Sequence, residues 1–194
     1  MNRRPLLALI LFLPMLVRQA SASALEAQQR LHGAVDEVLA VADRVADRRA
    51  LADKLRLVLQ RHVSFETMTR RAIGPGWRQF TSDQQRKATQ LFTTLVIRTY
   101  SNKFTPGERP VITYKTAVAH AAGRVDVPTT LVYKGSHYSV TYRMEQEGGW
   151  RIADVVIEGV SMIANYRSQL DAQFKKAGAP AVISSLEQSV ARPQ

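Results

Sequence analysis

A change of hydrophobic period divides this 194-residue chain and limits the folds it can adopt. Before Thr105-Pro106-Gly107, apolar residues recur about every 3.6 positions, as they do in amphipathic helices. After it, apolar and polar residues alternate, as they do in half-buried strands. A helical pattern returns after residue 160. Helices, then hairpin-linked strands, then helices predict one α+β domain.

Local signals refine this reading of the helical parts. Ser64 and Ser161 stand where an N-cap is expected, and Thr81 with Gln84 forms a capping box. Gly178-Ala179-Pro180 is typical of a helix end. The expected helices cover residues 25–49, 50–62, about 65–74, about 81–103, 161–176 and 181–190.

The strand half reads as an antiparallel meander. Lys134-Gly135-Ser136 and Glu147-Gly148-Gly149 supply tight turns between alternating segments. The pattern predicts a curved sheet of about four strands, at residues 111–116, 124–133, 137–146 and 150–158.

The first 24 residues have the composition of a secretory signal peptide. Arg3 and Arg4 precede an apolar run from Leu6 to Val17, which is short for a bilayer span of about 20 residues. Small residues offer cleavage after Ala22 or Ala24. We therefore expect residues 1–24 to be removed and residues 25–194 to form a single periplasmic domain. An uncleaved membrane anchor is the alternative.

Charge is concentrated in one segment. The formal net charge is +11, and residues 54–109 hold 11 Lys and Arg against three acids. A basic face in a cytosolic protein would suggest nucleic acid. For an exported chain we expect none, and anionic headgroups, an acidic partner protein or a merely solvated face stay open.

Catalytic signals are weak. The four His residues are scattered, so no metal site is predicted, and no phosphate-binding loop or other cofactor motif occurs. Asp154 and Glu158 lie four positions apart on an expected strand and could form an acid/base pair. Outward-facing polar residues on a half-exposed strand are the preferred interpretation of this pair. We therefore expect no enzyme.

Two sequence blocks resemble a known family. The first runs from Ile73-Gly74-Pro75-Gly76-Trp77-Arg78 to Tyr100, and the second from Gly148-Gly149-Trp150 to Asn165-Tyr166-Arg167. Together they are similar to the MlaC / toluene-tolerance family of periplasmic lipid-binding proteins, which includes hopanoid-associated members. The segment at Gly178-Ala179-Pro180 departs from the family pattern.

The resemblance implies a cone related to the nuclear transport factor 2 fold, with an internal apolar cavity. It also implies a non-catalytic carrier, expected to be a monomer, that binds phospholipid or a hopanoid-type lipid. Its implied partners are an inner-membrane ABC lipid transporter complex and an outer-membrane lipoprotein complex, so that lipid asymmetry of the outer membrane is maintained.

Facing in the expected elements suggests which residues contact lipid. Apolar residues of the long helix and of the sheet are candidates for the acyl chains, and polar residues nearby are candidates for the mouth. The tail candidates are Phe92, Leu95, Val96, Tyr138, Val140, Tyr142, Val155 and Ile157, and the mouth candidates are Arg98, Tyr100, Asn165 and Arg167.

Two rival functions remain at this stage. One is a periplasmic enzyme on the same cone, with Asp154 and Glu158 both facing the cavity. The other is an interaction module with a solid core and a basic docking segment. A cavity of several hundred Å³ separates the carrier from the second rival.

Overall fold

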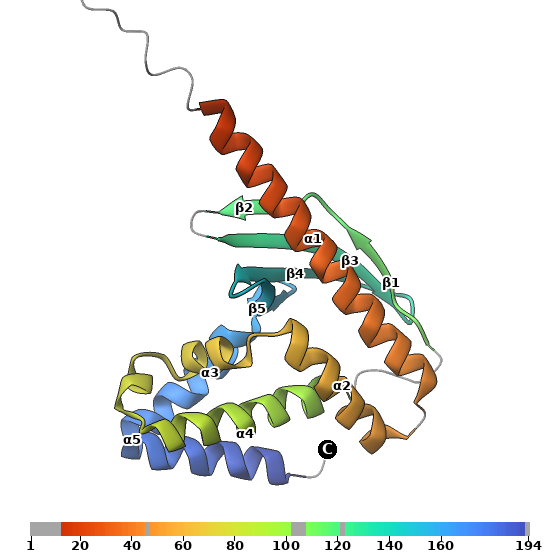
Figure 1. Ribbon diagram of the computed structural model, residues 1–194. Helices are drawn as coiled ribbons and strands as arrows, with labels where there is room; N and C mark the ends of the chain where they lie inside the picture. Colours follow the sequence, from red (N-terminus) through yellow and green to blue (C-terminus); the bar gives the residue numbers. More distant parts are fainter. Residues whose placement is uncertain (1–12, 46, 102–107, 121–122, 193–194) are drawn as a thin grey trace, which may run out of the picture.

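Helices lie against one face of an antiparallel sheet in the computed structural model, which describes residues 13–45, 47–101, 108–120 and 123–192. This confirms the α+β class. Figure 1 shows α1 crossing the sheet diagonally, while α3, α4 and α5 gather below the sheet in this view. The helices are α1 (Leu13–Arg44), α2 (Arg48–His62), α3 (Phe65–Ile73), the 3-10 helix η1 (Gly74–Gln79), α4 (Ser82–Ser101) and α5 (Met162–Ala191).

The sheet has six strands among the described residues, two more than expected. Its order is β1-β3-β4-β5-β6, with β2 also pairing with β3, and all these pairs are antiparallel. The unexpected strands are the short β2 and β6. The bounds are β1 (Val111–Tyr114), β2 (Val118–His120), β3 (Arg124–Tyr133), β4 (Ser136–Gln146), β5 (Trp150–Ile157) and β6 (Val160–Ser161).

Two tight turns and one irregularity shape the sheet. Lys134 and Gly135 have φ of 50° and 76°, and Glu158 and Gly159 have φ of 49° and 78°. Positive φ at both central residues is typical of type I′ hairpins, whose twist matches that of the strands. The register of β4 and β5 shifts between Arg143 and Met144, and such a bulge bends the strand.

The helix caps agree with the sequence in two cases and differ in a third. Thr81 N–H donates to Gln84 Oε1 (2.9 Å) and Gln84 N–H to Thr81 Oγ1 (3.3 Å), so the capping box is confirmed. Ser161 Oγ accepts the N–H of Ala164 at 3.0 Å, as expected of an N-cap. Ser64 occupies the cap position of α3 but makes no side-chain cap bond, and its hydroxyl donates to Glu147.

Helix α5 is longer than either helix expected there. It continues to Ala191 with non-helical backbone at Ala177 and Gly178. The expected break therefore exists, but it is a kink between two helical parts. Gly178 has φ of 64°, a conformation that glycine adopts without a steric penalty.

The N-terminal helix begins within the expected signal peptide. Residues 1–12 lie outside the described part, whereas α1 is continuous through the expected cleavage positions. Ala24 and Ala27 are buried and belong to the main core. Within the described part of the chain, no helix is both long enough and apolar enough to span a bilayer.

Candidate functional site

The main cavity lies between the helices and the inner face of the sheet. It has a volume of about 280 Å³, is partly open, and its wall is almost entirely apolar. This cavity contradicts the rival expectation of an interaction module whose interior has no cavity. The wall comes from α1, α2, α3 and α4, from strands of the sheet, from Val63 and Pro110, and from Met162, the first residue of α5.

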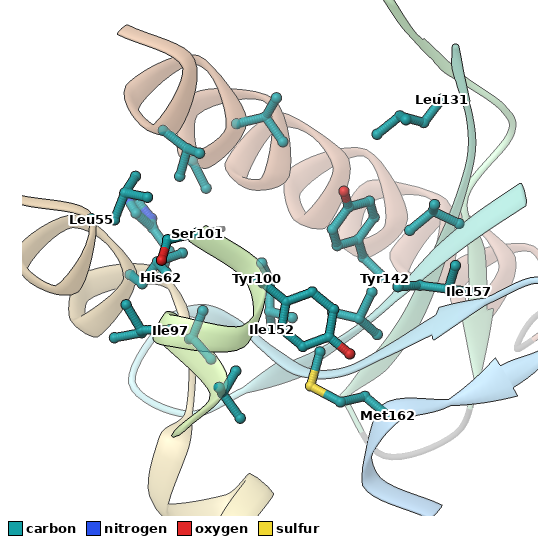
Figure 2. Close-up of a pocket in the computed structure, with 18 of the residues that line it drawn as sticks. Leu55, His62, Ile97, Tyr100, Ser101, Leu131, Tyr142, Ile152, Ile157 and Met162 are labelled. Atoms are coloured by element: carbon teal, nitrogen blue, oxygen red, sulfur yellow. The ribbon is translucent and has the colours of Figure 1, made fainter. Parts of the chain in front are cut away.

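The helices supply one side of this wall. Their apolar periodicity places the same face of α1 and α2 against the cavity, and the end of α4 closes it. Figure 2 shows Leu55, His62, Ile97 and Ser101 grouped at one end. The helical lining is Ala34, Val35, Val38, Leu39, Leu55, Leu59, His62, Phe65, Met68, Val96, Ile97, Tyr100, Ser101 and Met162, with Val63 beside them.

The sheet supplies the other side. Alternate residues of a strand share a face, so β4 presents Val140 and Tyr142 and β5 presents Val155 and Ile157 to the cavity. Leu131 of β3 also lines it. In Figure 2, Leu131, Tyr142 and Ile157 lie at the opposite end from His62 and Ser101.

Tyr142 keeps its proton in this environment. Burial raises the pKa of its phenol to about 12, because the charged phenolate is poorly solvated in apolar surroundings. Burial likewise raises the pKa of Tyr100. The cavity wall therefore carries no phenolate charge at neutral pH and suits hydrocarbon.

His62 is a basic side chain on the otherwise largely apolar wall of the cavity. Its Nε2 lies 3.2 Å from Glu37 Oε1, yet neither ring nitrogen has a hydrogen bond of good geometry. Glu37 also pairs with Arg61, and both neighbours, Arg61 first, lower the pKa of the Glu37 carboxyl. The Glu37 side chain is 44% exposed, so this negative partner is in contact with solvent.

The cavity contains part of the predicted site. Val96, Val140, Tyr142, Val155 and Ile157 lie on its wall, and so does Tyr100, which was expected at the mouth.

The other tail candidates lie elsewhere. Phe92 is fully buried in the core, where its ring meets Tyr166 edge-on at 5.0 Å between centroids. Leu95 is also a core residue, and Tyr138 is exposed. These three residues were expected to contact the acyl chains, but none of them lines the cavity.

The remaining mouth candidates are also away from the cavity wall. Arg98 donates to the carbonyls of Val190 and Arg192, which ties α4 to the end of α5. Asn165 and Arg167 are exposed on the first turns of α5.

The sequence analysis missed the contribution of α1 and α2 to the cavity. Val35, Leu55 and Leu59 lie in the expected helices at residues 25–49 and 50–62, where apolar residues recur at helical spacing. Their period was the available signal, but it predicts only an inward direction. Whether the interior is filled or hollow depends on packing between elements.

The proposed acid/base pair does not form. Asp154 is buried and accepts hydrogen bonds from Ser161 Oγ (2.6 Å), Ile163 N–H (3.2 Å) and Arg143 (3.1 Å). Glu158 belongs to the exposed turn after β5, where its carboxylate accepts the N–H of Ser139. Neither carboxylate lines the apolar cavity.

Five basic residues in the described part of the 54–109 segment form ion pairs, four of them with acids from other parts of the chain. Exposed ion pairs contribute little to stability, but they reduce the local excess of positive charge. The pairs are Arg61–Glu37, Arg71–Glu145, Arg86–Asp83, Lys87–Glu187 and Arg109–Asp43. Among the described residues, no group of three or more potential ligands is placed to hold a metal ion.

A second hollow adjoins the first. It has a volume of about 370 Å³ and a largely polar wall that includes Arg56, Glu147 and Arg151. Val63 and Phe65 line both hollows. Glu147 accepts the hydroxyls of Ser64 and Thr67, so its carboxylate is already engaged at the start of α3.

Comparison with known proteins places this architecture. A phospholipid-binding protein from Ralstonia solanacearum, solved in complex with a phospholipid, is 26% identical and has a TM-score of 0.79. The match covers 86% of this chain and 97% of that one. No curated protein sequence matches the chain. The profile of the MlaC protein family matches residues 31–188, and the chain therefore belongs to the MlaC family.

Proposed function

We propose that this protein is a soluble carrier that holds the acyl chains of a phospholipid in its apolar cavity. The observation that carries this proposal is the hollow of about 280 Å³ between helices and sheet, with an almost wholly apolar wall. A related protein of the same fold has been solved with a phospholipid bound. We propose that the carrier is non-catalytic.

The physical need for a carrier is clear from the cost of exposing hydrocarbon. Burying one methylene is worth about 0.8 kcal/mol, so two chains of about 16 carbons cost on the order of 25 kcal/mol to move into water. A wall of Val, Leu, Ile and Met side chains replaces the bilayer for these chains. The lipid can then leave a membrane without full exposure.

The cellular role follows from the family resemblance. We propose that residues 1–24 direct export and are removed, and that residues 25–194 act in the periplasm as a monomer. The carrier would move phospholipid, or a hopanoid-type lipid, between an outer-membrane lipoprotein complex and an inner-membrane ABC lipid transporter. This role would maintain the lipid asymmetry of the outer membrane.

Native mass spectrometry of protein isolated from a bacterial periplasm tests the binding function. We expect the polypeptide to carry phospholipid. Val155→Trp places a large ring in the cavity, whereas Val156→Trp places the same ring on the other face of β5. We expect the first variant to lose bound lipid and the second to keep it. Equal lipid content in both folded variants would contradict tail binding in this cavity.

A further inference from the structure

The inner face of the sheet becomes more exposed toward one end. Val127 and Val140 are buried, and Val140 lines the cavity. Two residues further along β4, Tyr138 is 38% exposed, and Val160 of β6 is 62% exposed. Both residues lie near the tight turns at Lys134-Gly135 and Glu158-Gly159. At this end of the sheet, apolar side chains therefore extend beyond the residues that line the cavity.

Strand register shows that these two residues continue the cavity wall. Tyr138 pairs with Leu131, and Val160 pairs with Ile157; both partners line the cavity. Directly paired residues of antiparallel strands lie on the same face. We call Tyr138 and Val160 the outer strip.

The cavity is too small to hold two complete acyl chains in this conformation. A dry cavity of about 150 Å³ accommodates one benzene, or six carbons. By that measure, the cavity of about 280 Å³ takes on the order of a dozen carbons. Two phospholipid tails carry roughly 32 carbons, so most of their length must find another apolar surface.

The dimensions of the sheet fit this need. From Tyr142 to Tyr138 the strand advances four residues, or about 14 Å. One leaflet of a bilayer has a hydrocarbon thickness of about 15 Å, half of the full core. A tail that starts beside Tyr142 therefore reaches the outer strip before the headgroup.

We infer that the lipid site extends out of the cavity onto Tyr138 and Val160, which contact the segments of the acyl chains nearest the headgroup. This inference rests on the proposed function as a lipid carrier. The headgroup then lies beyond the outer strip, at the end of the sheet that carries the two hairpin turns. Arg98, Asn165 and Arg167 take no part in this mouth.

Val160→Asn and Val111→Asn form a matched pair for testing the outer strip. Val111 is 64% exposed, close to the 62% of Val160. Its neighbour Ile112 faces the cavity, so Val111 faces the opposite side of the sheet. Tyr138→Ser is a second variant of the strip. Binding is measured by titration with hexane, a chain of six carbons without a headgroup, and by equilibrium transfer from vesicles of phosphatidylethanolamine and phosphatidylglycerol with chains of about 16 carbons.

Hexane, a short chain without a headgroup, fits inside the cavity and does not depend on the strip, whereas the long chains of a phospholipid cross the strip on their way to the headgroup. We expect Val160→Asn and Tyr138→Ser to weaken long-chain binding about tenfold and to leave hexane binding unchanged. Val111→Asn should change neither. Equal long-chain binding by Val160→Asn and Val111→Asn would overturn the inference and indicate that the cavity widens around whole chains. Loss of hexane binding in the strip variants would also overturn it. A wild-type protein that binds neither hexane nor the long-chain phospholipids would overturn the carrier function itself.

Discussion

Ser161 donates its hydroxyl to Asp154 across 2.6 Å, and this contact joins the last long strand to the final helix. The other carboxylate oxygen of Asp154 accepts the N–H of Ile163 in the first turn of α5. A carboxylate at a helix N-terminus satisfies donors that have no partner within the helix. Asp154 is thus a structural residue that fixes where α5 leaves the sheet.

Replacing Asp154 should destabilise the protein. Asp154→Ala leaves Ile163 N–H and Ser161 without this acceptor, and it removes the partner of Arg143. We expect a loss of about 3 kcal/mol in the free energy of unfolding. Urea denaturation followed by circular dichroism measures this loss. The control Glu158→Ala alters an exposed turn and should cost less than 1 kcal/mol, about the net value of one hydrogen bond; comparable losses in both would contradict the assigned role.

The packing of α5 against η1 predicts a sensitive glycine. A Cβ built on Gly76 would lie 2.8 Å from ring atoms of Phe174. Gly76→Ala must therefore displace this ring, and overpacking of this kind costs about 1–3 kcal/mol. Thermal unfolding should show a lower Tm for Gly76→Ala. The double variant Gly76→Ala with Phe174→Leu tests the cause, since the smaller side chain should relieve part of the added cost.

Two tyrosines, Tyr114 and Tyr142, should lose their protons late in an alkaline titration. Burial raises the pKa of both Tyr114 and Tyr142 to about 12, from an ordinary value near 10. Because the folded state resists deprotonation, stability from these groups is fully present below pH about 10 and is lost as the pH rises toward about 12. Ultraviolet absorbance should show their phenolates forming later than those of the unfolded chain. Tyr142→Phe should remove one late-titrating group, and an unchanged late phase would show that Tyr142 ionises with the ordinary tyrosines.

Export predicts a defined new N-terminus. Intact-mass measurement of periplasmic protein should give a chain that begins at Ser23 or Leu25. Ala24 is buried in the main core, so a start at Ser23 preserves that packing whereas a start at Leu25 removes it. A periplasmic chain that still begins at Met1 would contradict cleavage.

Local signals in the sequence predicted local structure well. The capping box at Thr81 and Gln84 depends on residues three apart, and the turn at Lys134-Gly135 depends on two adjacent residues. Both formed as predicted because no distant group competes for them. At Ser64 the prediction failed in part, because the hydroxyl donates to Glu147, which is 83 positions away.

For the candidate site, the sequence could predict which face of an element a side chain lies on, but not whether that side chain lines a cavity. Val140 and Tyr142 were placed correctly on the inner face because strand alternation fixes facing. The same alternation includes Tyr138, but it cannot tell where along β4 the covering helices end. The side of the cavity formed by Val35 and Leu55 depends on how α1 and α2 pack over the sheet, and no local pattern encodes that distance.

The wall shared by the two hollows controls whether water can enter the apolar cavity from the polar one. Val63 and Phe65 lie between the apolar cavity and the second, polar hollow, whose wall includes Arg56 and Arg151. Phe65 supplies the larger of these two side chains. Removing that ring would connect the apolar cavity to the polar hollow. Water entering through the polar hollow would then compete with hydrocarbon for the space in the cavity.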